Sequence, residues 1–242
     1  MRLPIHIGCA GWTLPRAVQP AFPADGTHLT RYAARFPAVE INSSFYRPHR
    51  PATYERWAAS VPERFRFAVK VPKAITHERR LTDAGDAIAR FLEQLAGLGD
   101  RLGCLLVQLP PSLTYDESVA GDFARSLRAL YGGAVAVEPR HESWFGPGVE
   151  RLLVEHGMAR VAADPARVPA AGEPGGDGRT VYYRLHGSPR IYYSSYGDEY
   201  LDALAGALRS AAAKAESVWC IFDNTASGAA AANALDLLAR LE

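Results

Sequence analysis

Short apolar runs recur along the 242-residue chain, and most are followed by a segment with helical periodicity. Runs of this length are typical of strands that are buried on both faces of a parallel sheet. Between the runs, apolar residues at three-four spacing predict amphipathic helices, the clearest extending from Ile88 to Leu98. The expected strands are Ile5–Cys9, Ala38–Ile41, Phe65–Val71, Cys104–Leu109, Ala134–Val137, Ala159–Ala163, Val181–Leu185 and Val218–Phe222.

Eight strand–helix units in one chain predict a (β/α)₈ TIM-type barrel that forms a single domain over residues 1–242. A doubly wound open sheet is the alternative, but Gly8-Cys9-Ala10-Gly11 lacks the spacing of its Gly-rich first turn. One unit is irregular, because the segment 164–179 is rich in Pro and Gly and has no apolar period. We expect this segment to be a loop that replaces the sixth helix and is able to act as a lid.

Composition and charge narrow the class of protein. Hydrophobic residues make up 48% of the chain and its net charge is +1, so no global field attracts it to membranes or nucleic acid. The N-terminal sequence lacks the apolar run of a signal peptide, and no stretch approaches the roughly 18 apolar residues of a membrane span. Cys9, Cys104 and Cys220 all lie in or at the end of apolar runs, which favours buried thiols in a reducing compartment. We expect a cytoplasmic protein without a membrane partner; the sequence carries no signal for its oligomeric state.

Polar side chains concentrate where the predicted strands end. In barrels of this kind, the carboxyl ends of the strands meet at one mouth and form the site. The residues at these ends are Gly8 to Trp12, Glu40, Asn42, Lys70, Lys73, Gln108, Glu138, Arg140, Trp144, Asp164, Arg184, His186, Asp223 and Asn224. Since a buried charge is costly unless it is paired, two interpretations are open. The groups either form a ligand site or fill the top of the barrel with ion pairs such as Glu40–Lys70 and Glu138–Arg184.

The loops beyond the strand ends are basic and carry aromatic residues. Their basic residues are Arg47, His49, Arg50, Lys73, His77, Arg79, Arg80, Arg140, Arg167 and Arg190, and their aromatic residues are Phe45, Tyr46, Trp144, Phe145, Tyr192, Tyr193 and Tyr196. Much of the acid lies on the predicted helices instead. A basic and aromatic face favours an anionic ligand that combines phosphate with a base or a sugar. The alternative is that these are ordinary solvated surface charges.

Several chemistries fit the strand-end residues. Glu40 and Glu138 have the residue types of a glycosidase pair, and His186 is the best single candidate for a general acid or base, with a structural histidine as its alternative. For a metal, the carboxylates and imidazole that would converge are Glu40, Glu138, Asp164, His186 and Asp223. No short metal-ligand motif occurs, and Lys70, Arg140 and Arg184 would disfavour a cation among them. We therefore predict no cofactor, with a divalent metal as the alternative.

The ordered motifs of the chain resemble those of the YecE-like proteins, the family called domain of unknown function seventy-two. The motifs are VEINSSFYRPHRPATYERWA, FAVKVPK, LLVQLPPS, AVEPRHESWF, YYRLHG and FDNTASGAAAANALDL, and they span nearly the whole chain. The resemblance implies a (β/α)₈ barrel broadly similar to the xylose-isomerase and apurinic-endonuclease group, and no established activity. The family positions that it implies at the strand ends are Glu40, Lys70, Gln108, Glu138, Arg140, Trp144, Arg184, His186, Gly187 and Asn224.

Two positions depart from the pattern that this resemblance implies. Pro139 stands where relatives commonly carry an aromatic residue, and Asp223 stands where they carry Asn. The loop after Trp12 also lacks a second Trp and a Tyr, which argues against a stacking role there.

These observations lead to three hypotheses. In the first, a barrel binds a phosphate-bearing ligand, nucleic acid or a sugar phosphate, at its mouth and hydrolyses its phosphate ester or glycosidic bond if it is an enzyme. In that hypothesis Lys70, Arg140 and Arg184 hold the anion, Gln108 and Asn224 contact the ligand, Trp144 and Tyr46 stack on it, and Glu40, Glu138 and His186 transfer protons. The second hypothesis is a metal-dependent phosphodiesterase that resembles the endonuclease barrels, and the third is a binding protein without catalysis.

Overall fold

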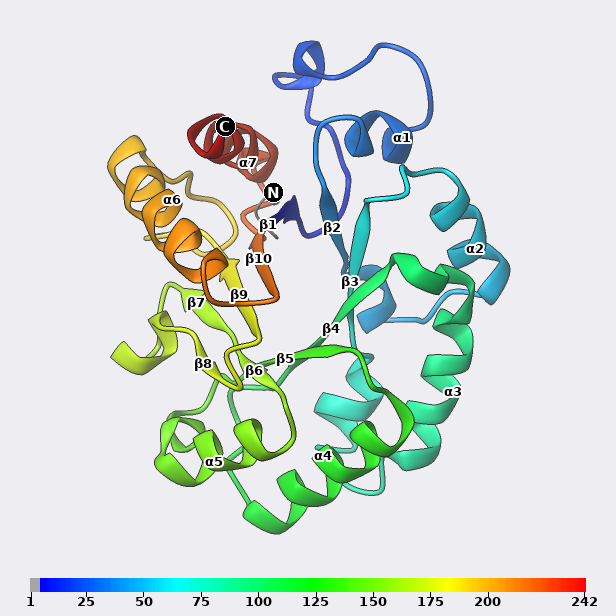
Figure 1. Cartoon of the computed structure of the whole chain (residues 1–242), viewed down its shortest axis with the longest axis vertical. Coiled ribbons are helices and arrows are strands. Elements are labelled where there is room, and N and C mark those ends of the chain that lie inside the picture. The colour runs from blue at the N-terminus through cyan, green and yellow to red at the C-terminus, as the bar shows by residue number, and fades with distance from the viewer. Residues whose placement is uncertain (1–4) are drawn as a thin grey trace.

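The computed structural model describes residues 5–242, and within that range α-helices alternate with short parallel strands. The strands are β1 (Ile5–Cys9), β2 (Ala38–Ile41), β3 (Arg66–Lys70), β4 (Leu102–Gln108), β5 (Ala134–Glu138), β6 (Ala159–Arg160), β7 (Ala162–Asp164), β8 (Gly175–Gly176), β9 (Thr180–Leu185) and β10 (Ser217–Phe222). The α-helices are α1 (His28–Ala33), α2 (Pro51–Ala59), α3 (Gly85–Leu95), α4 (Glu117–Leu130), α5 (Pro147–Glu155), α6 (Asp198–Ala212) and α7 (Ala229–Leu241). The helices lie outside the strands (Figure 1).

The strands form two sheets. The first has the order β1-β10-β9-β7, and the second has the order β2-β3-β4-β5-β6-β8. All pairs are parallel except β6 with β8, which is antiparallel. The chain is therefore a mixed α/β protein with parallel sheets, as the alternating pattern predicts.

The two sheets contact each other at both of their ends. At one end, Ala10 and Glu40 form a parallel bridge, and the Gly11 amide donates to the Glu40 carbonyl at 2.9 Å. At the other end, β6 and β7 are separated by Val161 alone, so that one short stretch of chain pairs with β5 through β6 and with β9 through β7. The Val161 amide also donates to the Val137 carbonyl at 2.9 Å.

Alternate residues of each strand enter two different cores. One buried cluster lies between the strands and the helices and includes Val39, Val69 and Val137. A second, smaller cluster contains the alternating positions on the other face of the strands: Ala38, Ala68, Cys104, Leu106, Ala136, Tyr182, Trp219 and Ile221. The residues that β2, β3 and β5 contribute to this cluster are alanine, which leaves space for the bulky side chains of β9 and β10.

Gly8 of β1 shows how tight this inner packing is. A Cβ atom at position 8 would lie 2.1 Å from the Ala38 carbonyl oxygen and 3.1 Å from the Tyr32 hydroxyl. The same hydroxyl donates to the Ala38 carbonyl at 3.0 Å and accepts from the Cys9 amide at 2.8 Å. β1 can approach β2 this closely because residue 8 has no side chain.

The sixth unit contains no α-helix between β7 and β9, as its Pro and Gly content predicts. It is more ordered than the sequence indicates, because it holds a 3₁₀ turn over Pro169–Gly172 and pairs through β8 with β6. The Arg160 guanidinium on β6 donates to the Ala170 and Glu173 carbonyls. These contacts hold the segment along the edge of β6, and none of them places it over the strand ends as a lid.

The predicted strands differ from the observed ones mainly at their ends. The exception is the run Ala159–Ala163, which is interrupted at Val161 where the chain passes from one sheet to the other. The three cysteines are buried free thiols, as predicted. Among residues 5–242, no helix combines the length and the hydropathy that a membrane crossing requires.

Candidate functional site

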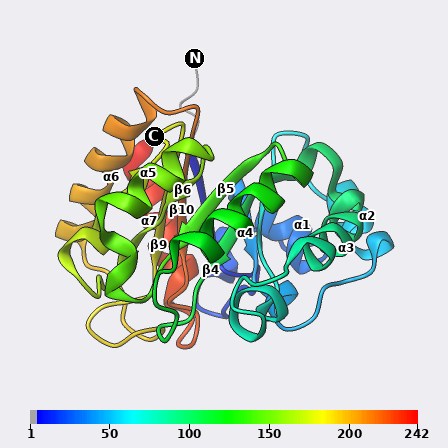
Figure 2. The ribbon, with the colours of Figure 1, turned by 90° about the horizontal axis from the view of Figure 1, so that it is seen from below.

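A set of buried polar side chains continues the inner face of the strands at their carboxyl ends. Each of these residues lies two positions after a residue of the inner cluster, so that alternation directs it to the same face. The residues are Glu40 after Ala38, Lys70 after Ala68, Gln108 after Leu106, Glu138 after Ala136, Arg184 after Tyr182 and Asp223 after Ile221. All six are buried. The loop between β9 and α6, which adjoins this end, lies on the side of the molecule opposite the C-terminus (Figure 2).

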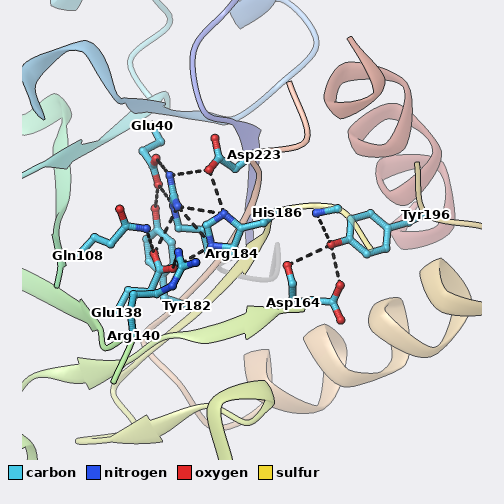
Figure 3. Close-up of polar contacts among 11 residues, drawn as sticks. Glu40, Gln108, Glu138, Arg140, Asp164, Tyr182, Arg184, His186, Tyr196 and Asp223 are labelled. Carbon is cyan, nitrogen blue, oxygen red and sulfur yellow. Dashed lines mark hydrogen bonds and ion pairs between the residues drawn. The ribbon is translucent and has the colours of Figure 1, made fainter. Parts of the chain in front are cut away.

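Arg184 is the centre of this cluster. Its Nε and Nη2 atoms donate to the two carboxylate oxygens of Glu40 at 3.0 and 2.7 Å. Nη1 lies 3.3 Å from Glu138 Oε2, and Nη2 lies 3.1 Å from Asp223 Oδ2. In Figure 3, dashed lines join this guanidinium to the carboxylates around it. Burial works to lower the pKa of Arg184, but the charges of Asp223, Glu40 and Glu138 outweigh it and raise the pKa further above its usual range.

Glu40 has no free carboxylate oxygen. The Tyr182 hydroxyl donates to Oε2 at 2.9 Å, and Arg184 takes both oxygens in a bidentate pair. Tyr182 is fully buried on the inner face of β9, two residues before Arg184. The expected ion pair between Glu40 and Lys70 is not found within residues 5–242, because the guanidinium of Arg184 occupies that carboxylate instead.

His186 lies between two carboxylates. Its Nε2 is 2.8 Å from Glu138 Oε1, and its Nδ1 is 3.1 Å from Asp223 Oδ2. Burial works to lower the pKa of His186, but the Glu138 charge and the hydrogen bonds to Asp223 and Glu138 outweigh it and raise the pKa. With both ring nitrogens engaged, the imidazolium holds the carboxylates in place and has no N–H group free for a ligand.

Glu138 accepts the largest number of contacts in the cluster. Besides His186 and Arg184, the Gln108 Nε2 donates to its Oε2 at 2.9 Å, and Arg140 Nη1 lies 3.4 Å from its Oε1. Burial works to raise the pKa of Glu138, but the charges of His186 and Arg184 outweigh it and hold the pKa well below its usual range. Glu138 is therefore ionised and cannot donate a proton at neutral pH.

Lys70 differs from the other charged groups of the cluster. No ion pair or hydrogen bond of its Nζ is found within the described residues, although only 7% of the residue is exposed. The ammonium lies 4.0 Å from the ring centroid of Phe45, which follows β2 in the 3₁₀ turn Ser43–Phe45. The Ser44 hydroxyl fixes this turn against β3 by donating to the Lys70 carbonyl at 2.7 Å. Burial and the neighbouring Arg184 charge lower the pKa of Lys70 to about 8, against a smaller opposing effect of the carboxylates.

Asp223 provides the one carboxylate oxygen of the central cluster that has no partner in the part of the chain described. Its Oδ2 binds both His186 and Arg184, whereas Oδ1 makes no hydrogen bond or ion pair there. Burial works to raise the pKa of Asp223, but Arg184 and the hydrogen bond from His186 outweigh it and lower the pKa. Asp223 is thus an ionised carboxylate with one oxygen available to accept a proton.

Three predicted ligand residues lie apart from this cluster. Trp144 is 3% exposed and donates its indole N–H to the Leu113 carbonyl at 2.9 Å, so its ring packs in the core and is not available for stacking on a ligand. Asn224 is fully buried, and its amide donates to the Ser194 carbonyl and to Asn233. Tyr46 is 74% exposed, and its ring lies edge-on to Phe45.

Two participants in the cluster were not among the predicted site residues. Tyr182 lies inside a strand rather than at its end, and only the alternation Tyr182–Arg184 marks it as an inner residue. Phe45 appears in the sequence as one of many loop aromatics, and its contact with Lys70 depends on the turn after β2. Asp223 stands at a strand end in the sequence, but its part in holding Arg184 and His186 follows only from the contacts.

The carboxylates of the cluster surround the Arg184 guanidinium, which occupies the oxygens that a metal ion would bind. Arg184 occupies both oxygens of Glu40 and one oxygen each of Glu138 and Asp223, which are the donors that a cation would need. Within residues 5–242, no group of three or more His, Cys, Asp or Glu side chains has an arrangement that could hold a metal ion.

Comparison with known proteins adds the following similarities. The model of the family described as protein of unknown function DUF72 matches residues 6–242. The protein YecE of Escherichia coli K12 is 32% identical over 173 residues, which cover 69% of this chain and 61% of that protein. The alignment thus spans less than two thirds of the length of YecE. The protein YunF of Bacillus subtilis 168 is 24% identical over 269 residues, covering 98% of this chain and 95% of that protein.

Solved structures share the fold. A DUF72 family protein of Thermotoga maritima MSB8 superimposes with a TM-score of 0.82 at 24% identity, with 98% of each chain covered. A DUF72 family protein of Enterococcus faecalis V583 gives a TM-score of 0.80 at 22% identity, over 98% of this chain and 95% of that one. At this level of identity the likeness concerns the fold alone.

Proposed function

Because the chain belongs to the family described as protein of unknown function DUF72, we propose a function from the chemistry of its strand ends: it binds a phosphate-bearing small molecule there. The ligand's anionic group is held by Lys70 and Arg140. The observation that carries this proposal is the Lys70 side chain, which is buried at the end of β3 and whose ammonium has no ion pair in the described chain. A buried cation without a counterion is costly, and an anionic ligand relieves that cost.

The charge balance of the cluster supports an anionic ligand. Glu40, Glu138 and Asp223 supply three negative charges, whereas Arg184, protonated His186, Lys70 and Arg140 supply four positive charges. The sum of these charges is +1, and Lys70 is the cation that has no carboxylate partner in the described chain. Arg140 makes one long contact with Glu138, at 3.4 Å, and its side chain is 15% exposed, so its remaining donors are free for a ligand.

The arrangement modifies the roles expected from the sequence. Arg184 is enclosed by carboxylates and organises the site, while Lys70 and Arg140 bind the ligand. Asp223, through its free oxygen, replaces His186 as the group that accepts a proton in any reaction. Because these residues are nearly enclosed, a small phosphorylated molecule fits better than a nucleic acid strand.

The two sheets contact each other at both ends, and this arrangement suits a closed barrel. We infer that the eight strand positions form one closed (β/α)₈ ring, in which β6 and β7 together count as the sixth strand. The bridge between Ala10 and Glu40 and the passage of the chain at Val161 support this closure. In such a ring, the carboxyl ends of all strands surround a single mouth.

Calorimetric titration with inorganic phosphate and ribose 5-phosphate tests the proposal. We expect wild-type protein to bind both, and Lys70→Met and Arg140→Ala each to weaken binding about tenfold or more, the effect of one lost charge-assisted contact. Arg125→Ala, at an exposed pair on α4, is the control that leaves binding unchanged. Thermal unfolding of each variant establishes that it is folded. Absence of binding to the wild type, or equal binding by all variants, would contradict the proposal.

A further inference from the structure

Anion binding alone does not explain why position 70 is a lysine and not an arginine. The chain holds 27 Lys and Arg residues, and only positions 70, 73 and 214 are lysine. An arginine binds phosphate with more donors and keeps its charge when buried, whereas a buried lysine can lose its proton. Lys70 can become neutral where an arginine cannot, and it is also the basic residue of the site that has no ion pair in the described chain.

The surroundings of Lys70 increase the fraction of its amine that is neutral at pH 7. Its side chain is enclosed, with its Nζ 4.0 Å from the Phe45 ring, and the positive Arg184 lies near. Burial beside another cation is the arrangement that activates lysines for nucleophilic attack. At a pKa of about 8, about a tenth of the amine is unprotonated at pH 7, compared with roughly one part in 2,500 for an ordinary lysine.

Asp223 supplies the second group that nucleophilic chemistry needs. Its Oδ1 has no partner in residues 5–242, its Oδ2 is fixed by His186 and Arg184, and its charge acts on Lys70. A held carboxylate with one free oxygen can accept a proton from an attacking nitrogen and return it to a leaving oxygen.

We propose that Lys70 condenses with the carbonyl group of an aldehyde or ketone that also carries a phosphate, and forms an imine. This inference rests on the proposed phosphate site, with Arg140 holding the phosphate. The Nζ lone pair forms a bond to the carbonyl carbon, and the carbonyl π electrons move to the oxygen. Asp223 transfers a proton from nitrogen to that oxygen. Asp223 then transfers the remaining nitrogen proton to the hydroxyl group, which leaves as water while the nitrogen lone pair forms the C=N bond. No oxidant or reductant is consumed.

Reductive trapping tests this inference. Glycolaldehyde phosphate with sodium cyanoborohydride reduces any imine to a stable secondary amine, which peptide mapping by mass spectrometry locates. We expect the adduct on Lys70 to exceed those on Lys73 and Lys214 at least about tenfold at pH 7, since burial and the Arg184 charge lower the pKa of Lys70 to about 8. Lys73 is a matched internal control, because it lies three residues away, pairs with Glu78 and is 45% exposed. Inorganic phosphate should suppress labelling of Lys70, and glycolaldehyde without phosphate should label it less.

Two variants identify the trapped amine, and phosphate binding is measured separately on the wild type. Lys70→Arg should abolish trapping, because a guanidinium does not condense with the carbonyl as an amine does. Lys73→Arg should leave trapping and phosphate binding unchanged. Labelling confined to Lys73 and Lys214 while phosphate still binds would overturn the imine and leave the phosphate site standing. Absence of phosphate binding to the wild type would overturn the phosphate site.

Discussion

At the residue scale, Arg184 determines how the site is organised. Three carboxylates and a histidine are buried together, and an assembly of this kind is tolerated only when every charge has partners. Arg184 contacts all three carboxylates, and His186 bridges two of them. Lys70 stands outside this set of contacts. The residue types were predictable from the strand ends, but the choice of Arg184 over Lys70 as the partner of Glu40 was not, because it depends on how far each side chain reaches between the two sheets.

Removal of the central guanidinium should be severely destabilising. Arg184→Met leaves three buried carboxylates without their main counterion, and we expect it to lower the free energy of unfolding by about 3–5 kcal/mol. Arg125→Met, which removes an exposed pair on α4, should cost less than about 1 kcal/mol. Urea unfolding measures both. Similar small losses in the two variants would show that the buried contacts contribute no more than a surface pair.

His186 should make stability depend on pH. Its pKa is raised in the folded state, so its contribution is fully present below the unfolded value of about 6.5 and is lost as pH rises through the folded pKa. The difference in unfolding free energy between wild type and His186→Gln should therefore shrink from pH 6 to pH 9.

The contribution of His6 to stability should change with pH in the opposite direction to that of His186. Burial and the Arg66 charge lower its pKa to about 4, so its contribution is present above about pH 6.5 and is lost as pH falls toward 4. The difference between wild type and His6→Gln should shrink in acid. A pH-independent difference for His186→Gln would mean that its ring is not held as an imidazolium.

At the scale of elements, alternation within short strands places the site. The pattern of apolar runs predicted the parallel strands and the missing sixth helix, because buried strands and amphipathic helices leave strong periodic signals. The interruption at Val161 and the two-residue β8 have no periodic pattern in the sequence. Both depend on which strand is the neighbour of β6 in the folded chain. Trp144 was expected to face a ligand because it follows β5, but the 3₁₀ turn Glu142–Phe145 directs its ring into the core.

The close approach of β1 and β2 should not tolerate a side chain at position 8. Gly8→Ala places a Cβ against the Ala38 carbonyl oxygen, and we expect overpacking to cost about 1–3 kcal/mol. Gly206→Ala is the matched control, because position 206 lies in α6 with no atom near its Cβ; it should stabilise by about 0.5–1 kcal/mol. If both variants unfold at the wild-type urea concentration, β1 and β2 have room for a Cβ atom at position 8, which would contradict the close contact with the Ala38 carbonyl.

At the scale of the whole molecule, the fold gathers side chains from six strands at one place. Glu40 and Arg184 are 144 positions apart in the chain yet form a bidentate pair. Length, alternation and strand-end polarity were sufficient to predict which end of the sheets carries the cluster of buried polar residues. They were not sufficient to separate its organising charges from its ligand-binding charges, because burial and pairing are properties of the folded chain.

The central claim is that Lys70 has no counterion until an anionic ligand binds to it. The protonation of the Lys70 amine tests this claim most directly. A chain with only three lysines, grown with ¹³C-labelled lysine, allows each side chain to be titrated by NMR. The account predicts that Lys70 titrates near pH 8 and that saturating phosphate raises this pKa, since a bound anion favours the charged amine. A Lys70 that titrates at about 10.4, the usual value for lysine, and does not respond to phosphate would contradict it.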